Sequence, residues 1–81
     1  MNIKIEFNPV TTIKYQIPEA GLVSLKVYNI LGEAVATLVN EIKRPGSYTV
    51  DFNSGKLASG VYFYELSANH FRSTKKFLLM K

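Results

Sequence analysis

The chain of 81 residues contains no cysteine and a single histidine, His70. Without cysteine there is no internal disulfide, no thiolate nucleophile and no cysteine-bound metal. A single histidine excludes a metal site built from several imidazoles and leaves few options for acid–base catalysis. No apolar run approaches the roughly 18 residues of a membrane helix, so membrane insertion is not expected. The first residues alternate charged with apolar side chains, which is not a secretory signal.

Length limits the chain to one small domain. A domain usually has roughly 100–200 residues, and a chain of this size buries only about 60% of its unfolded surface. The composition is typical of a globular protein, with 47% hydrophobic and 20% charged residues. We therefore interpret residues 1–81 as a single domain with one modest core.

The net charge of +4 is confined to the end of the chain. Lysines, arginines and acids cancel over residues 1–69, whereas residues 70–81 contain four cations and no acid. The four are Arg72, Lys75, Lys76 and Lys81. They are too few, on too short a stretch, to indicate nucleic-acid binding. Two interpretations stay open: lysines that keep a strand edge soluble, or a basic recognition tag.

Alternation of apolar and polar residues dominates the chain and predicts β-strands. The alternating stretches are 3–7, 13–17, 23–27 and 48–52. Val61–Ala68 is apolar on both faces, which is typical of a strand central in its sheet or covered on both sides. Glu33–Ile42 has some helical character, but its β-branched residues favour a strand that runs into a loop.

Turn residues, mostly glycine, proline and asparagine, separate these stretches. Asn8 and Pro9 break the first strand from the second, and Asn69 with His70 forms a late hairpin turn. Six or seven short strands with such spacing predict an all-β sandwich or barrel. The strands should be antiparallel, since no connection is long enough for a crossover helix. The residues expected inside are Ile13, Tyr15, Val23, Leu25, Val27, Val50, Phe52 and Leu66.

No arrangement of side chains indicates catalysis, so the chain is not expected to be an enzyme. His70 alone could activate a serine, and its place beside Asn69 favours an exposed turn. Asp51 and Glu65 could approach each other across two strands. A glycosidase needs its two carboxylates beside a substrate cleft, and strand surfaces of so small a domain leave no room for one.

No cofactor or metal is expected either. Asp51, Asn53 and Ser54 offer three oxygen ligands, whereas calcium prefers six to eight. Four aromatic residues could form a platform for sugars, although their alternation within strands favours packing in the core. These are Tyr28, Tyr62, Phe63 and Tyr64.

Four segments in order carry a more specific signal than any single residue. They are Phe7–Tyr15, Val27–Glu33, Leu57–Tyr64 and Lys75–Lys81. Together they resemble the type A C-terminal sorting domain of the type IX secretion system, found in Bacteroidetes and related phyla. They look like its opening Asn-Pro strand, its hairpin with tyrosine and glycine, its Leu-x-x-Gly-x-Tyr signature and its final basic, apolar, basic strand. In place of the Asn- and Pro-rich loop that usually precedes the first strand stands Met1–Ile5.

The resemblance implies an immunoglobulin-like sandwich that serves as a non-catalytic export signal. The domain would be the C-terminal part of a larger secreted protein and would fold in the periplasm after Sec export. The implied partners are the outer-membrane translocon, a sortase-like peptidase and an upstream cargo domain. The implied location is outside the cell or on its surface.

The residues expected to contact the translocon lie in the last strand, Phe71–Lys81, and in one turn. In the strand they are Lys75, Lys76, Phe77, Leu78, Leu79, Met80 and Lys81. We expect the lysines to project toward solvent and this terminal strand to lie at a sheet edge, available to a partner. In the turn they are Gly60, where a Cβ would clash, and Tyr62, with a buried ring and a bonded hydroxyl.

Two alternative functions remain at this point. One is an accessory module of an extracellular hydrolase that binds carbohydrate or cell-surface material and exposes aromatic residues in a plane. The other is a structural domain like the immunoglobulin-like domain of flagellar hook-capping proteins, whose Gly-Val-Tyr-x-Tyr strand looks similar. A sorting signal should end with its chain, and Lys81 directly follows the last apolar run.

Overall fold

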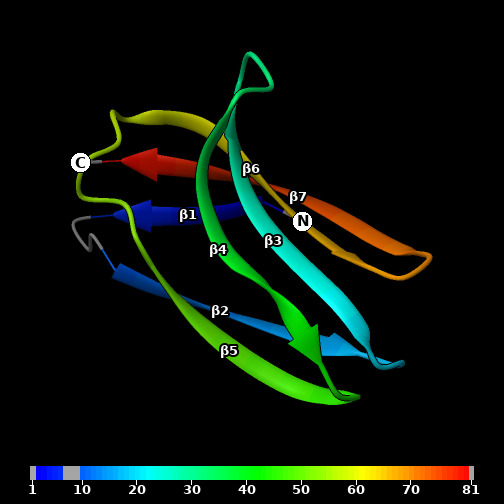
Figure 1. Ribbon diagram of the computed structural model, residues 1–81. Coiled ribbons are helices and arrows are strands. Elements are labelled where there is room, and N and C mark those ends of the chain that lie inside the picture. The colour runs from blue at the N-terminus through cyan, green and yellow to red at the C-terminus, as the bar shows by residue number, and fades with distance from the viewer. Residues whose placement is uncertain (1, 7–9, 81) are drawn as a thin grey trace.

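The computed structural model describes residues 2–6 and 10–80, which form seven β-strands (Figure 1). The strands are β1 (Asn2–Glu6), β2 (Val10–Ile17), β3 (Gly21–Asn29), β4 (Ala34–Lys43), β5 (Gly46–Asn53), β6 (Gly60–Ala68) and β7 (Phe71–Met80). Within this part of the chain no helix is long and apolar enough to cross a membrane. The segment with helical character is the strand β4, and it continues to Lys43 instead of ending in a loop.

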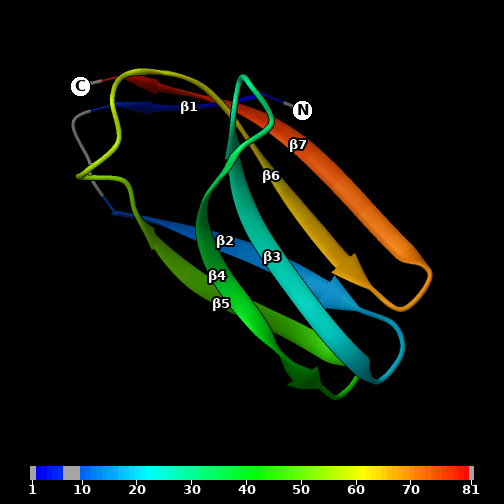
Figure 2. The same cartoon turned by 45° about the horizontal axis from the view of Figure 1, so that its top comes forward.

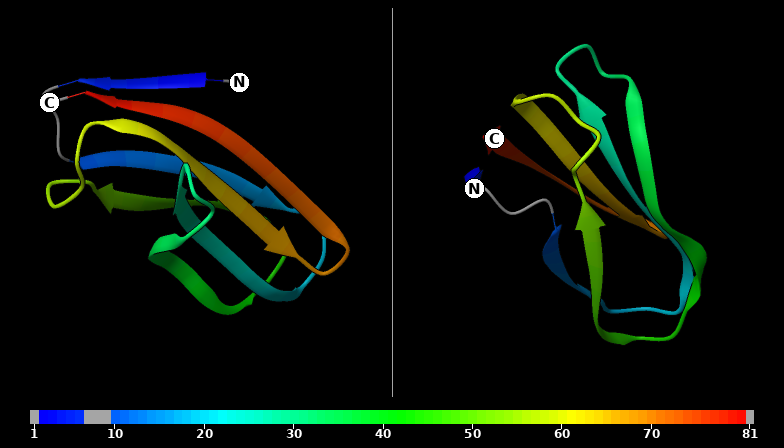
Figure 3. Two further views of the ribbon diagram at one scale, coloured as in Figure 1. Left: turned by 90° about the horizontal axis from the view of Figure 1, so that it is seen from above. Right: turned by 90° about the vertical axis from the view of Figure 1, so that its left-hand side faces the viewer.

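The strands form two sheets that pack face to face. One sheet has five strands in the order β1-β7-β6-β3-β4, and the other pairs β2 with β5. The right-hand view of Figure 3 shows β2 and β5 as one layer beside the layer of the remaining strands. The predicted all-β, immunoglobulin-like sandwich is confirmed, with seven strands.

One pairing departs from the predicted antiparallel arrangement. The first strand, β1, runs parallel to the last strand, β7, with Ile3 opposite Phe77 and Ile5 opposite Leu79 (Figure 2). Short connections force antiparallel pairing only on strands that are consecutive in the chain. Because β7 lies between β1 and β6, the expectation that it forms a sheet edge was wrong. The predicted break at Asn8 and Pro9 lies outside the described residues.

The core lies between the two sheets and follows the predicted phase of each strand. Val23, Leu25 and Val27 of β3 are fully buried, as is Leu79 of β7. Of the eight residues expected inside, seven are buried. The eighth, Val50, is half-buried and packs against the core from β5.

Two asparagines fix the turns at opposite ends of the five-stranded sheet. Asn29 Oδ1 accepts hydrogen bonds from the backbone N–H groups of Leu31 and Glu33, each at 3.0 Å. Asn69 begins the β6–β7 turn with a φ of 55°, and its Nδ2 donates to the Ala20 carbonyl at 3.0 Å. The second contact ties this turn to the β2–β3 turn. His70 is exposed in the β6–β7 turn, as predicted.

Candidate functional site

The predicted recognition residues come together because β6 and β7 are neighbours. Their antiparallel register places Gly60 opposite Leu79 and Tyr62 opposite Phe77. The Leu-x-x-Gly-x-Tyr segment and the final basic and apolar segment therefore form one hairpin surface. In a strand, successive side chains point to opposite faces, so the hairpin divides these residues into an inward set and an outward set.

The inward set is part of the core. Tyr62, Phe77 and Leu79 are 8%, 2% and 1% exposed. The ring of Phe77 stacks on Tyr62 at 5.7 Å, and it contacts Phe52 and Tyr64 at 6.0 Å each. The Tyr62 hydroxyl donates a hydrogen bond to the Ala58 carbonyl at 2.7 Å. Tyr62 therefore has the buried ring and the bonded hydroxyl that the sequence predicted. These side chains hold the hairpin in place and are not available to a partner.

Gly60 is not kept as glycine by a steric clash, contrary to the expectation from the sequence. A Cβ at this position would meet only the Tyr62 ring, at 3.9 Å, which is ordinary van der Waals contact. The φ of 158° nevertheless lies in a range that L side chains rarely adopt. The predicted clash with a neighbouring residue was therefore wrong, and the backbone conformation at the start of β6 is what favours glycine at this position.

The outward set is accessible and mixes apolar with basic character. Leu78 and Met80 are each 39% exposed. Lys76 is also exposed and lies on the same face of β7, two residues before Leu78. Their β6 neighbours Val61 and Phe63 stand opposite Leu78 and Lys76 and are half-buried. We call these five residues, Val61, Phe63, Lys76, Leu78 and Met80, the β6–β7 outer surface. Sequence reasoning missed its two β6 residues, although the apolar character of both faces of Val61–Ala68 indicated them.

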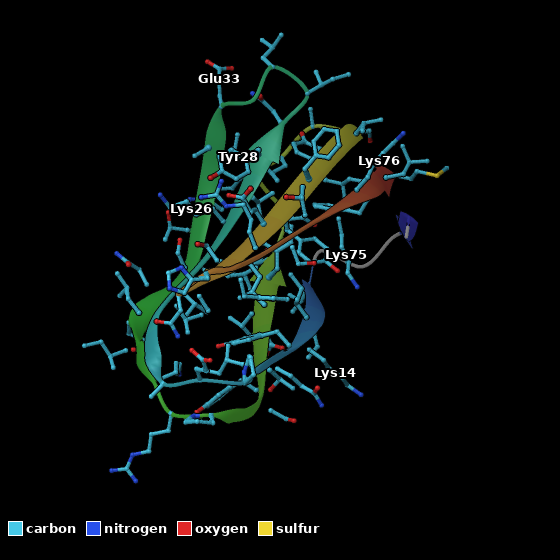
Figure 4. The ribbon with its side chains drawn as sticks, turned by 90° about the vertical axis from the view of Figure 1, so that its right-hand side faces the viewer. Lys14, Lys26, Tyr28, Glu33, Lys75 and Lys76 are labelled. Atoms are coloured by element: carbon cyan, nitrogen blue, oxygen red, sulfur yellow. The ribbon has the colours of Figure 1, made fainter. Side chains whose placement is uncertain are left out.

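Lys75 points the other way from Lys76. It shares the inward phase of Phe77 and Leu79 and is half-buried. In Figure 4 it lies between β7 and β2, while Lys76 lies on the opposite side of β7. The expectation that both lysines project freely to solvent was therefore wrong for Lys75, because adjacent residues in a strand face opposite sides. Lys81 lies outside the described residues.

The two carboxylates considered for catalysis do not form a pair. Asp51 and Glu65 belong to different sheets, and the buried neighbours Phe52 and Leu66 show that each acid faces outward. Asp51 accepts a hydrogen bond from the Thr12 hydroxyl at 2.8 Å. Glu65 accepts one from Thr74 at 3.2 Å. Each acid is thus solvated on its own outer face of the sandwich.

The oxygen and aromatic groups considered for ligands are also separated. Asn53 Oδ1 accepts a hydrogen bond from the Gly55 N–H at 2.9 Å, and Ser54 is buried. Over residues 2–6 and 10–80 no group of three or more histidine, aspartate or glutamate side chains could hold a metal ion. Tyr62 and Tyr64 face the core, whereas Tyr28 and Phe63 pair on the outer face. The four aromatic residues therefore form no single platform.

Three side chains have shifted pKa values, and none belongs to the β6–β7 outer surface. Burial raises the pKa of Tyr64, and burial is also the main reason that the pKa of Tyr15 is raised. A hydrogen bond to Glu41, at 2.5 Å, raises the pKa of Lys43. All three groups keep their ordinary protonation state at neutral pH, so none of them is prepared for acid–base chemistry.

Comparison with protein families decides the identity of the chain. The model of the secretion system C-terminal sorting domain matches residues 2–80. The chain belongs to this family. The resemblance seen in four segments is thereby confirmed, and the sorting domain is a signal for type IX secretion, which implies export to the cell surface or beyond.

The solved structures that match the sorting domain include an immunoglobulin domain. The first immunoglobulin domain of mouse SynCAM 2 matches with 13% sequence identity and a TM-score of 0.49. The match covers 98% of the sorting domain and 88% of that chain. No curated protein matches the sequence.

Proposed function

We propose that the sorting domain is a non-catalytic recognition module and that the outer-membrane translocon of the type IX secretion system binds its β6–β7 outer surface. One observation supports this assignment. The two C-terminal segments that resemble the family's motifs pair in register and leave one apolar and basic face exposed. The proposal keeps the residues selected from the sequence and divides their roles between holding the hairpin and contacting the partner.

The composition of this surface suits a protein partner. Interfaces bury apolar side chains at their centre and place charges at the rim. Leu78, Met80 and the half-buried Phe63 supply the apolar centre, and Lys76 supplies a positive charge beside it. Lys81 follows this strand in the sequence and adds a second cation to the proposed contact. Lys75, on the inward side, has at most a supporting role.

The proposal includes the wider route that the family implies. The domain is the last part of a larger exported protein, folds in the periplasm and is contacted there by the translocon. A sortase-like peptidase then separates it from the upstream cargo. In this scheme the domain supplies a rigid surface, and the partners supply all of the chemistry.

The test is a secretion assay. Residues 1–81 are fused to an inert reporter with a Sec signal in a host that has type IX secretion. The variant Lys76→Gln/Leu78→Thr removes charge and apolar area from the outer surface without touching the core. We expect secretion of this variant to fall at least about tenfold, since central interface side chains contribute most of a binding energy.

The matched control is Arg44→Gln/Lys56→Gln, two exposed cations outside the outer surface. It should be secreted like the parent. Melting curves of both variants should lie close to that of the parent, because exposed single charges contribute little to stability. Leu78→Thr changes an exposed position outside the core and keeps a residue that favours strands. If the Lys76→Gln/Leu78→Thr variant folds and is secreted normally, the translocon binds another surface of the domain.

A further inference from the structure

A groove of about 980 Å³ opens between the two sheets, where β2 faces β6 and β7. It exists because the two-stranded sheet covers only part of the five-stranded sheet. Tyr15 and Tyr48, stacked at 5.5 Å, form one wall. Tyr64, Leu66 and Phe71 lie on the other wall. The groove is on the inward side of β7, away from the β6–β7 outer surface.

The edge of β2 borders this groove. Residues 13–17 of β2 all line it, including Lys14 and Gln16, which point away from the core. Residues 46–49 of β5, which pair with residues 14–17 of β2, line it as well, so the groove borders one end of the smaller sheet on both of its faces. Among the described strands β2 pairs with β5 alone. The edge that borders the groove therefore offers backbone N–H and C=O groups to a further strand.

Half-buried polar groups that are open to solvent gather on the opposite wall. Lys75 is half-buried, and no carboxylate of the described residues lies within ion-pair distance of its ammonium group. The hydroxyls of Tyr64 and Ser73 have no hydrogen-bond partner in the same part of the chain. Lys14 and Lys75 are the charged residues that line the groove, and both are cations. Figure 4 shows them on the same side of the molecule.

We propose that this groove binds an extended, acidic segment of a partner protein, which adds to β2 as a third strand of the smaller sheet. Alternate side chains of that segment would enter the groove. Apolar ones would cover Leu66 and Phe71, and a carboxylate would meet the ammonium group of Lys75. Charge complementarity selects an acidic segment over a basic one. This interaction goes beyond the proposed function, and neither proposal depends on the other.

The probe is a phage-displayed library of random peptides, about twelve residues long, selected on the 81-residue chain. We expect the selected peptides to alternate apolar residues with aspartate or glutamate. In amide hydrogen exchange, a bound peptide should newly protect alternate N–H groups of β2, whose outer edge is otherwise open to solvent. Peptides without acids, or protection confined to other strands, would overturn the proposal.

Charge variants provide the second arm. We expect Lys75→Glu to weaken binding of the selected peptides by about tenfold or more, because a close like charge replaces an attraction. Lys75→Gln should have a smaller effect in the same direction and serves if the glutamate variant does not fold. The control Lys56→Glu, outside the groove, should bind like the parent. Equal binding by all variants would contradict the proposal. So would a dimer in sedimentation whose formation protects the N–H groups of β2 from exchange.

Discussion

Tyr62 shows how a single hydroxyl stabilises the entry into β6. It donates a hydrogen bond of 2.7 Å to the Ala58 carbonyl, four residues earlier in the chain. Tyr62→Phe should lower the free energy of unfolding by about 1 kcal/mol, the usual net value of such a bond, as measured by urea unfolding. Tyr28→Phe is the control, since the Tyr28 hydroxyl has no hydrogen bond within residues 10–80. Equal losses in both variants would argue against a specific role for the Tyr62 hydroxyl.

Tyr64 gives a prediction about alkaline pH. Burial raises its pKa in the folded state above 10.0. The stability that depends on its neutral form is complete below pH 10, and it is lost as pH rises through the folded value, because the unfolded chain ionises first. Urea unfolding should therefore show stability falling above pH 10, with a shallower fall for Tyr64→Phe. Tyr15 shifts in the same direction, so some of the fall should remain in that variant. An identical pH dependence would refute the assignment to Tyr64.

The sequence was sufficient for most core residues because alternation determines which face of a strand is buried. Leu25 and Phe52 are inside as predicted. The same rule applied to Phe77 would have placed Lys75 inside as well. That conclusion was missed because lysine was treated as a solvent-facing residue by type. Long side chains can cross an apolar wall and still reach water with their charged end, so strand phase is the better guide.

At the level of elements, the β2–β3 and β6–β7 turns are coupled through Gly21 and Asn69. A Cβ on Gly21 would lie 2.2 Å from Asn69 Oδ1, so the asparagine must move and give up its bond to the Ala20 carbonyl. Gly21→Ala should cost about 1 kcal/mol. In an Asn69→Gly background, which keeps the positive φ, the same substitution should cost much less. Additive effects in this double-mutant cycle would show that the two turns are independent.

The sequence did not reveal which strands are neighbours. Hairpins such as β6–β7 follow from short turns, and the two C-terminal motifs could have been paired on that basis. The contact of β1 with β7 joins opposite ends of the chain, and no local signal in either segment encodes it. The expectation of an exposed β7 edge failed for this reason, and the groove beside β2 was equally invisible because it depends on which sheet each strand joins.

For the whole molecule, the small core makes stability sensitive to a single side chain. Leu25 is 0% exposed, and Leu25→Ala should cost roughly 2–5 kcal/mol. A domain of this size has only about 5 kcal/mol in total, so this variant should be close to unfolded at room temperature. Leu22→Ala on the same strand is the control, because Leu22 is 59% exposed. Its cost should stay within about 0.5 kcal/mol, and a comparable loss in both variants would contradict the strand phase.

The parallel contact between β1 and β7 also sets the order in which the domain can be assembled. Contacts between distant parts of a chain form slowly, since the intervening segment must first be closed into a loop. Residues 2–6 cannot find their partners until residues 76–80 are present. The strand that carries Lys76, Leu78 and Met80 is held on both sides only at that stage. A translocon that binds this strand would thus bind completely folded domains and would not bind truncated or partly folded ones. The sorting signal would then also provide quality control of folding.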